Sequence, residues 1–419
     1  MRMSNDTIRV AAVTFDYYPF DVRVRRLAEA AADAGYDMDV ICLREPGEAR
    51  REVYNGVNIY RVPQHRGFGK ALPLTVLAWC WFMLLSGALL TRLHLRRRYD
   101  VVHVHNMPDF LVFCALIPKL LGAKVILDVQ DVSPELMSAK AGQGRARALL
   151  FRLAALQEAI SARFADSVVT VGWPFERLLL ARGVPQKKLA IVLNSADPKL
   201  FPPSRRCSAP SEQSQGSAEQ PLIIMYWGTV AERNGLDIAI RALALAQKQM
   251  PHLRLDIMGR GEHLPALRQL ADELGVAGSV RVSDPVPAER IVDFVVHGDI
   301  GIIPYRVDGF AELVLPTKAY ELAWMRRAII ASDTDAIRSM FRPESLMLCA
   351  PSDPESFAAA IVALASDPAR REQLVAAAAE DYVPYQWEAM GARYQHLLAT
   401  LSHKRAAARE PETASVSTR

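Results

Sequence analysis

The chain has 419 residues, and its 50 lysines and arginines nearly balance 46 aspartates and glutamates, which leaves a formal net charge of +4. This length corresponds to about two to three average domains. Hydrophobic residues make up 51% of the chain, enough apolar material for two cores. The charge balance argues against a dedicated nucleic-acid-binding protein, because phosphate affinity needs concentrated positive charge. We therefore expect a globular protein of at least two domains with no nucleic-acid partner.

The five cysteines are scattered along the chain: Cys42, Cys80, Cys114, Cys207 and Cys349. Their spacing forms no CxxC metal motif, and their odd number is unlike the disulfide framework of a small secreted protein. Residues 1–10 contain neither the apolar core nor the cleavage site of a signal peptide. These features predict reduced thiols and a cytoplasmic location.

Short apolar runs alternate with helix-like stretches through the first half of the chain. The helix expected at 22–34 has apolar residues at near-helical spacing. The predicted strands are 8–15, 38–42, 57–62, 101–105, 124–128, 167–171 and 189–193. This alternation is typical of an α/β doubly wound parallel sheet.

The same rhythm occurs a second time after a polar interruption. Residues 202–221 are rich in Ser, Pro, Gln and Gly, and this composition predicts a linker. Further strands are expected at 222–227, 253–258, 280–282, 300–303, 328–331 and 345–349. We therefore predict a domain at 1–198, a linker at 199–220, a second domain at 221–384, a helix at 385–402 that returns to the first domain, and a flexible tail at 403–419. Two such domains place a ligand cleft between the carboxyl ends of two sheets.

Residues 71–91 contain no charged side chain and are long enough for a helix to cross a bilayer. Both flanks are basic, with Arg66 and Lys70 before the segment and Arg92 and Arg96 to Arg98 after it. Positive charge on both sides fits two ends held on one cytoplasmic face. We favour an interfacial or half-buried helix over a buried core helix, and both over a transmembrane span.

Residues 312–333 contain the most informative pattern. Pro316 is suited to the first position of a helix that runs to about Arg326, which makes Leu315 the N-cap. Leucine has no oxygen with which to cap the first-turn amides, so these amides and the helix dipole form an anion site suited to a diphosphate. Lys318 lies in the same turn, and Glu321 lies one turn later, where its carboxylate is able to accept ribose hydroxyls. The alternative is an ordinary amphipathic helix with a solvated Lys318–Glu321 pair.

Other motifs are weaker. The DxD tripeptides at 37–39 and 333–335 resemble a divalent-metal motif, but both positions favour turns or a strand start. Gly259 and Gly261 lack the third glycine of a dinucleotide fingerprint. We therefore expect no metal and no bound cofactor.

Eight segments together resemble, in order, the landmarks of glycosyltransferase family 4, the retaining group with the GT-B fold of two Rossmann-like domains. The segments are FDVRVRRLAEAAADAGYDMDVI (20–41), DVVHVHNMPDF (100–110), LDVQDVSPE (127–135), VLNSADPKLF (192–201), YWGTVAERNGLDIAIRAL (226–243), LDIMGRGE (255–262), GDIGIIPY (298–305) and ELVLPTKAYEL (312–322). The resemblance extends over nearly the whole length of the chain, because these segments are spread between residues 20 and 322, and it therefore applies to both predicted domains.

The resemblance implies roles for particular residues. It assigns the donor nucleotide-sugar to Glu321, Gly228, Thr229, Gly259, Leu315, Pro316 and Thr317, and catalysis to Arg233, Lys318, Glu312 and His105. We assign acceptor or sugar contacts to Asp21, Asn106, Asp109, Gln130 and Asp131. Asn106 and Asp109, like His105, lie at or just after the carboxyl end of the expected strand 101–105, where they would face the cleft. The chain departs from the family at four places. Eight residues separate the two glutamates instead of seven, Asn234 replaces a lysine, Gln130 replaces a histidine, and residues 18–21 stand where family members often carry a glycine pair before the first helix. For Asn106 and Asp109, local turn capping is an alternative to a ligand contact.

These features predict a metal-independent retaining hexosyltransferase that uses a nucleotide-diphosphate sugar. Charge that develops on the leaving phosphate would be stabilised by Arg233, Lys318 and the helix start. The expected acceptor is a glycan or a polyprenyl-linked glycan at an anionic membrane surface, in cell-envelope or exopolysaccharide synthesis. Two alternatives remain, another GT-B enzyme such as a nucleotide-sugar epimerase, and a non-catalytic nucleotide-sugar-binding scaffold.

Overall fold

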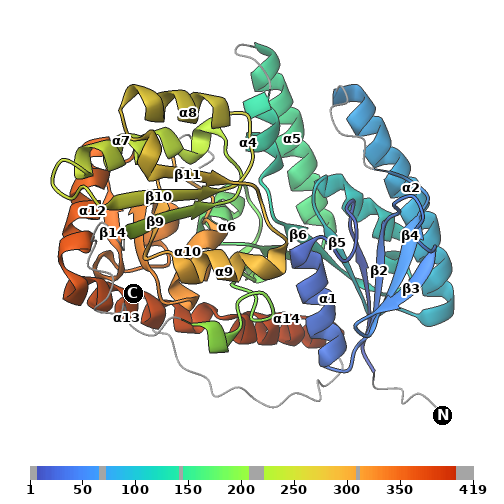
Figure 1. Cartoon of the computed structure of the whole chain (residues 1–419). Coiled ribbons are helices and arrows are strands. Elements are labelled where there is room, and N and C mark those ends of the chain that lie inside the picture. Colours follow the sequence, from blue (N-terminus) through green and yellow to red (C-terminus); the bar gives the residue numbers. More distant parts are fainter. Residues whose placement is uncertain (1–6, 66–71, 141–144, 207–220, 308–311, 403–419) are drawn as a thin grey trace. The chain divides into compact units, whose positions relative to one another are not determined.

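The computed structural model describes residues 7–65, 72–140, 145–206, 221–307 and 312–402 (Figure 1). The chain divides into two compact units, which are described separately. The first unit comprises Met1–Val171, Phe175–Leu193 and Glu388–Arg419, and the second comprises Gly172–Pro174 and Asn194–Trp387. Residues 207–220 of the expected linker and all of the expected tail lie outside the described residues, as does Cys207. The other four cysteines form no disulfide.

The first unit is built on one sheet with the strand order β3-β4-β2-β1-β5-β6-β7-β8. Its strands are β1 (Arg9–Val13), β2 (Asp37–Leu43), β3 (Arg51–Tyr54), β4 (Val57–Val62), β5 (Val101–His105), β6 (Lys124–Val129), β7 (Ser167–Thr170) and β8 (Leu189–Ile191). All pairings are parallel except that of β3 with β4. The central strands are buried on both faces, which explains their nearly continuous runs of Val and Ile.

Strand β3 is absent from the sequence prediction. Its four residues are all exposed and mostly polar, so they lack the apolar run by which the other strands are recognised. The turn that joins β3 to β4 is Asn55-Gly56, and both residues have positive φ, 47° and 79°. This is the two-residue hairpin turn that Asn-Gly favours. The dipeptide was therefore the signal that could have identified the hairpin.

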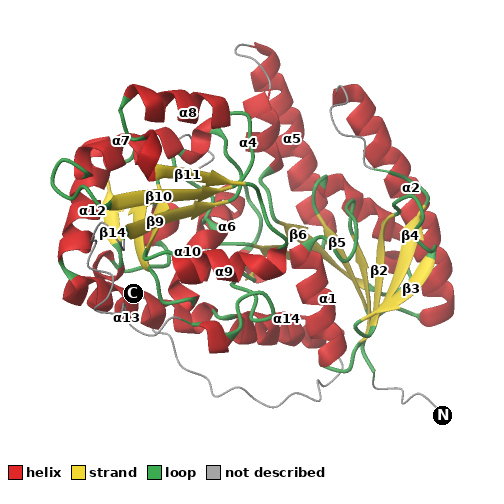
Figure 2. Cartoon of the chain, viewed as in Figure 1, coloured by secondary structure: helices red, strands yellow, loops and turns green. Residues whose placement is uncertain are grey.

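Helices surround the first sheet (Figure 2). They are α1 (Val22–Asp33), α2 (Leu72–Arg97), the 3-10 segment η1 (Asp109–Ala115), α3 (Leu116–Leu120), α4 (Ser133–Lys140), α5 (Arg145–Phe164), α6 (Trp173–Ala181), η2 (Gln186–Lys188) and α14 (Trp387–Ser402). Most of α6 and all of α14 from Glu388 onward belong to this unit. Two distant parts of the sequence therefore contribute to one core.

The second unit has a six-stranded parallel sheet with the order β11-β10-β9-β12-β13-β14. Its strands are β9 (Leu222–Trp227), β10 (Leu253–Met258), β11 (Val280–Ser283), β12 (Ile300–Ile303), β13 (Ala328–Ser332) and β14 (Met347–Cys349). Its helices include α7 (Leu236–Ala246), α8 (Leu264–Glu273), α9 (Ile291–His297), α10 (Thr317–Trp324), α11 (Asp335–Arg338), α12 (Pro354–Ser366) and α13 (Pro368–Tyr382). Short 3-10 segments are η3 (Pro203–Arg205), η4 (Glu232–Asn234), η5 (Ala277–Ser279), η6 (Ala288–Arg290), η7 (Pro343–Ser345) and η8 (Val383–Tyr385).

Both sheets reverse their strand order once, between β1 and β5 in the first unit and between β9 and β12 in the second. In open parallel sheets the crevice beyond the carboxyl ends of the strands at this reversal is the usual ligand position. The prediction of two doubly wound parallel sheets is confirmed. The segments that follow β5, β9 and β12 are consequently the first places to look for a site.

Candidate functional site

The loop after β9 approaches the neighbouring strand closely. Gly228 has φ +121° and donates its amide to the carbonyl of Met258 at 2.9 Å. A Cβ on Gly259 would lie 1.9 Å from the Gly228 carbonyl oxygen, and a Cβ on Gly228 would lie 3.0 Å from Lys318 Nζ. Both glycines are therefore required by backbone geometry, and they leave space directly beside a lysine ammonium group.

Lys318 is a buried cation without a carboxylate partner. Its side chain is 9% exposed, and its Nζ lies 4.6 Å from the ring centroid of Tyr226 and 3.5 Å from Tyr305 Oη. Within the described ranges, no carboxylate forms an ion pair with it. A buried charge is costly unless it is paired, so aromatic faces and one phenol compensate this cation only partly. The arrangement suits an anionic ligand.

Tyr305 lies at the carboxyl end of β12 and was not predicted as a site residue. Burial raises its pKa to about 12, with Arg233 lowering it and Glu321 raising it electrostatically. These influences show that the positive and the negative side chain both lie near this phenol. An aromatic residue directly after a central strand was the signal available in the sequence.

Glu321 is fixed by an indole. Trp227, at the end of β9, donates its Nε1–H to Glu321 Oε2 at 3.0 Å. Trp227 is 6% exposed and Glu321 is half-buried, so the carboxylate is held in place and still reaches solvent. Trp227 is a second site residue that the sequence reasoning missed.

Helix α10 begins one residue later than predicted. Pro316 is the N-cap, with ψ 128° outside the helical range, and Thr317 is the first helical residue. Leu315 therefore lies before the cap. The anion-site argument is unchanged, because no side chain caps the helix: proline, like leucine, has no side-chain acceptor.

The end of α10 also differs from the expected Arg326. Arg326 has φ 56°, and the amides of Arg326 and Arg327 bond to the carbonyls of Ala323 and Leu322 at 3.3 and 2.9 Å. This is a Schellman motif, which ends the helix at Trp324.

Asn234, Arg233 and Glu312 are the remaining positions that the sequence connects with the donor. Asn234, where the family has a lysine, donates to Tyr226 Oη and to the Thr229 carbonyl, so it stabilises the loop that carries Thr229. Arg233 is exposed beside it in η4. Glu312 is exposed in a turn, and no hydrogen bond or ion pair connects it to Lys318 or Glu321 in the part of the chain that the structure describes. The structure thus brings Arg233, Lys318 and Glu321 together near Tyr305 and leaves Glu312 unconnected.

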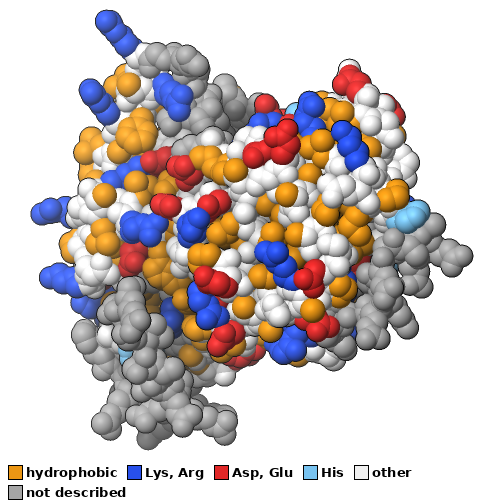
Figure 3. All heavy atoms as spheres, turned by 90° about the vertical axis from the view of Figure 1, so that its left-hand side faces the viewer, with side chains coloured by type: hydrophobic (Ala, Val, Ile, Leu, Met, Phe, Trp, Pro, Cys, Tyr) orange, Lys and Arg blue, Asp and Glu red, His pale blue; other side chains and the backbone are white. Residues whose placement is uncertain are grey.

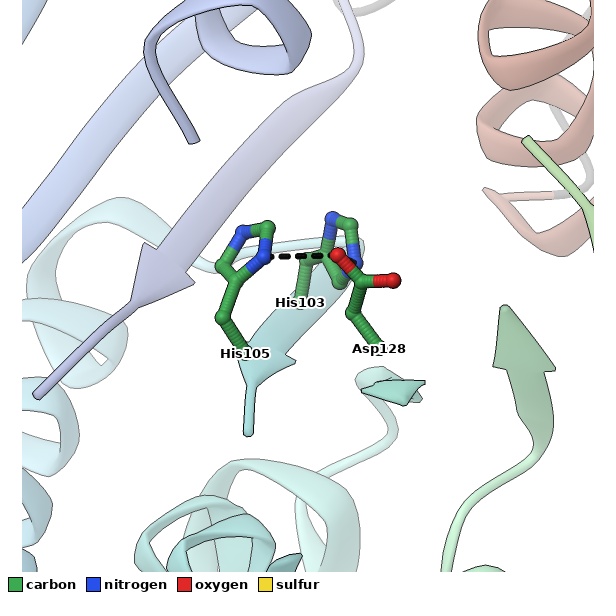
Figure 4. A group of neighbouring side chains, drawn as sticks. All are labelled: His103, His105 and Asp128. Carbon is green, nitrogen blue, oxygen red and sulfur yellow. Dashed lines mark hydrogen bonds and ion pairs between the residues drawn. The ribbon is translucent and has the colours of Figure 1, made fainter. Parts of the chain in front are cut away.

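The first unit contains a buried polar cluster at the carboxyl ends of β5 and β6. Arg23 of α1 donates from Nε and NH2 to both oxygens of Asp128, at 2.8 and 2.7 Å. His105 Nδ1 lies 2.8 Å from Asp128 Oδ2 (Figure 4). Although burial would raise the pKa of Asp128, Arg23 and His105 hold it well below its usual range. Asp128 is therefore a buried carboxylate whose charge is fully compensated.

His103 completes the cluster. Its Nδ1 lies 2.9 Å from the Tyr394 hydroxyl of α14, and burial lowers its pKa well below the usual value. One ligand atom from each of His103, His105 and Asp128 lies within 4.8 Å of the others, which is close enough for metal coordination. The donor set does not fit a divalent cation, however, because the guanidinium of Arg23 already occupies both oxygens of Asp128.

The predicted acceptor residues occupy the neighbouring turns. Asn106 donates to Asp109 Oδ1 at 2.8 Å and to the Asp131 carbonyl at 2.7 Å, and accepts from the Gln130 amide at 2.9 Å. It thereby joins the ends of β5 and β6. Asp109 is completely buried, and burial raises its pKa. Its carboxyl accepts hydrogen bonds from the side chains of Asn106 and Gln157, at 2.8 and 3.3 Å.

Asp21 and Gln130 also have internal partners. Asp21 is the N-cap of α1 and accepts from the amides of Arg23 and Val24 at 3.0 and 3.1 Å. Gln130 Nε2 lies 3.3 Å from His105 Nδ1. Gln130 and Asp131 are only half-buried.

The DxD motifs have structural partners. Asp37 and Asp39 both pair with Arg97 at 2.7 Å. Asp333 pairs with Arg338, and Thr334 caps α11. Asp37, Asp39 and Asp333 are therefore engaged in ion pairs within the protein.

Comparison with known proteins adds a family. Residues 21–195 match the model of the glycosyl transferase 4-like domain, and residues 221–367 match the model of glycosyl transferases group 1. D-inositol 3-phosphate glycosyltransferase of Thermobispora bispora is 22% identical over 411 residues, 92% of this chain and 93% of the relative. The GDP-mannose-dependent alpha-(1-6)-phosphatidylinositol monomannoside mannosyltransferase of Mycolicibacterium smegmatis is 26% identical over 211 residues, 48% of this chain and 54% of the relative.

Solved structures share the architecture. Sucrose-phosphate synthase from Thermosynechococcus elongatus aligns with a TM-score of 0.71 at 17% identity, covering 94% of this chain and 99% of that chain. The Anabaena protein HepE in complex with UDP-glucose aligns with a TM-score of 0.67 at 13% identity, covering 94% of this chain and 100% of that chain. Two consecutive domain matches and a fold shared over nearly the whole length lead to one conclusion: the chain belongs to glycosyltransferase family 4 and has the GT-B fold.

Proposed function

We propose that the chain is a retaining, metal-independent glycosyltransferase that takes a sugar from a nucleotide-diphosphate donor bound in the second unit. The observation that carries this proposal is the buried ammonium of Lys318, which has no carboxylate partner in the described residues and lies beside the gap kept open by Gly228. A diphosphate supplies the missing negative charge. The proposal is supported by the names of similar proteins, one dependent on GDP-mannose and one solved with UDP-glucose.

In this proposal the residues near Tyr305 have different chemical roles. Glu321, oriented by Trp227, accepts the ribose hydroxyls of the donor. Lys318, Arg233 and the uncapped first turn of α10 face the diphosphate and stabilise the charge that develops on the leaving phosphate. The acceptor hydroxyl attacks the anomeric carbon on the face from which the phosphate departs, and the phosphate oxygen takes its proton. This scheme needs no carboxylate nucleophile.

We assign the acceptor, a glycan or a lipid-linked glycan of the cell envelope or an exopolysaccharide, to the first unit. Among the predicted acceptor residues, Asp21 and, at the end of β6, Gln130 and Asp131 are half-buried, whereas Asn106 and Asp109 are buried, so these three offer the more accessible polar groups. His105, 1% exposed and bonded to Asp128, orients this edge of the sheet.

A panel of nucleoside diphosphates and nucleotide-sugars, scored by thermal shift in the presence of EDTA, tests the donor site. A ligand at about one hundred times its Kd adds roughly 2.7 kcal/mol of stability. We expect one base to give a selective shift that disappears in Glu321→Ala and Arg233→Ala. The matched controls are Glu289→Ala and Arg290→Ala, which change exposed residues of the same unit.

Product analysis distinguishes the reaction classes. A transferase moves the labelled sugar to an added acceptor and keeps the anomeric configuration, whereas an epimerase changes the donor without an acceptor. Selective donor binding with no turnover on any acceptor would favour the scaffold, and a complete lack of stabilisation would contradict the donor site itself.

A further inference from the structure

Helix α2 has two different faces. Its residues Leu74, Leu77, Trp81 and Leu84 are 54–65% exposed and recur at intervals of three and four, so they form one stripe. Phe82, Ser86 and Leu90 on the other side are completely buried. The described residues contain one helix that is long and apolar enough to cross a membrane, Pro73–Arg97, with a mean hydropathy of 1.9 and only 17% of its most apolar window buried.

Attachments along α2 argue against a transmembrane span. Arg97, in its last turn, pairs with Asp37 and Asp39 of β2 at 2.7 Å. Gln64 donates to the carbonyl of Ala78 at 2.8 Å. Crossing a bilayer would break these contacts and expose the buried face. The helix is therefore part of the first unit over most of its length.

Helix α5 carries a second apolar stripe. Leu149, Leu153, Leu156 and Ile160 are 50–58% exposed, again at intervals of three and four. Its opposite side is buried and includes Glu158, which Arg182 holds with two bonds of 2.9 Å. Length and hydropathy did not single out this helix, because its mean hydropathy is diluted by arginines.

The two helices pack against the same segment, η1. Trp79 of α2 meets Phe110 edge to face, and Phe164 of α5 meets Phe113 in the same way. Figure 1 shows that α2 and α5 start at the same end of the first unit. Helix α3, directly after η1, adds three more exposed residues, Leu116, Ile117 and Leu120, and the exposed Leu121 follows at its C-cap. We call the exposed apolar residues of α2, α3 and α5 the apolar platform.

The exposed charged side chains of α2, α3 and α5 are all basic. Glu158 is the only acidic residue within α2, α3 and α5, and it is buried. Exposed basic residues flank the stripes: Arg92, Arg96, Arg145, Arg147, Arg152 and Arg163. In contrast, acidic and basic side chains are interspersed over the face of the molecule in Figure 3. Exposed apolar stripes with basic flanks and no exposed carboxylate are typical of protein surfaces that bind an anionic bilayer.

We propose that the apolar platform is a membrane-docking surface. When the protein is docked, the exposed stripes of α2 and α5 both lie in the headgroup region of an anionic bilayer. This inference rests on the proposed function, since a lipid-linked acceptor would be met at that surface. It goes beyond the apolar segment 71–91 because it requires the second stripe on α5.

Flotation of the full chain with vesicles tests the proposal, using phosphatidylcholine alone or mixed with phosphatidylglycerol. We expect binding to the anionic vesicles. The variants Leu77→Ser/Trp81→Ser and Leu153→Ser/Leu156→Ser should each weaken it by at least about tenfold, because each removes two inserted side chains. Arg147→Gln/Arg152→Gln should weaken it by roughly fivefold per arginine. The control Val53→Ser/Val383→Ser, which changes apolar residues 64% and 56% exposed outside the platform, should bind as the wild type does.

Three results would overturn the proposal. The first is a wild-type chain that floats with neither kind of vesicle. The second is a loss confined to the α2 variant, which would leave α5 without a role. The third is a dimer, measured by light scattering, that dissociates in the platform variants without vesicle binding, which would make the platform an interface between two copies. Nucleotide stabilisation is measured on the same samples, so a failure of membrane docking is distinguished from a failure of the donor site.

Discussion

The polar cluster of the first unit and the proposed donor site of the second treat a buried charge in opposite ways. Asp128 is surrounded by Arg23 and His105, so the cluster is neutralised by the protein itself. Lys318 is also buried, but among the described residues its ammonium contacts aromatic rings and a phenol and forms no ion pair with a carboxylate. The pairing of Asp128 stabilises the first unit. The buried ammonium of Lys318 lowers the stability of the second unit, and a bound anion would restore it. The predictions below test this contrast.

Arg23→Met should have the largest effect. It leaves Asp128 buried without its cation and should destabilise the first unit by about 3–5 kcal/mol. Thermal unfolding followed by circular dichroism measures the loss. Arg163→Met changes an exposed arginine of the same unit and serves as the control. An Arg23→Met protein as stable as the control would show that the cluster is not electrostatically coupled.

Lys318→Met should behave in the opposite way. Removing an unpaired buried cation should leave the free protein as stable as before or slightly more stable. Its affinity for the nucleoside diphosphate should fall by about 1.5–3 kcal/mol, the usual contribution of a hydrogen bond to a charged group. Calorimetric titration measures this affinity, and Lys248→Met at an exposed position is the control. Destabilisation without loss of affinity would contradict the contrast.

Low pH should weaken the first unit through its buried histidines. Burial lowers the pKa of His103 well below its usual value, and burial together with Arg98 lowers the pKa of His94. In the unfolded chain both titrate near 6.5. The unfolded state then binds more protons below this pH, so stability present above about 6.5 is lost as the pH falls, by up to about 1.4 kcal/mol per pH unit for each histidine.

Thermal midpoints measured from neutral to mildly acidic pH give this slope. His103→Asn and His94→Asn should each reduce it, whatever they do to the midpoint itself. His396→Asn, at an exposed position of α14, should leave it unchanged. A slope that neither buried variant reduces would assign the pH dependence to other groups.

Asp21→Ala should have the smallest effect, about 1 kcal/mol, because it removes the N-cap of α1. Asp353→Ala, which removes the matching cap of α12 in the second unit, provides the comparison. Asp21→Ser keeps a capping oxygen and should recover the stability. If Asp21→Ser still transfers sugar poorly, Asp21 contacts a ligand as well as capping the helix.

Sequence patterns predicted what is local or periodic. Val57–Val62, Val101–His105 and Leu253–Met258 begin and end where the apolar runs do. The cluster around Asp128 was beyond such reasoning, because Arg23 is 105 residues away and the Tyr394–His103 contact joins residues 291 apart. Trp227 and Tyr305 were missed for a different reason. Aromatic residues at the end of an apolar strand resemble core residues in the sequence. The contacts of Tyr305 with Lys318 and of Trp227 with Glu321 are what connect them to the site.

Helix α14 has a consequence for the order in which the protein is made. Three residues of α14 are completely buried in the first unit: Met390, Tyr394 and Leu398. The strands of this unit are all synthesised before residue 194. During translation the second unit therefore has its full sequence before the first does. Until the last turns of α14 leave the ribosome, the nascent first unit lacks part of its core and exposes His103 and its neighbours. A chain stalled shortly before Trp387 is for this reason expected to depend on chaperones, although every strand of the two described sheets has already been synthesised.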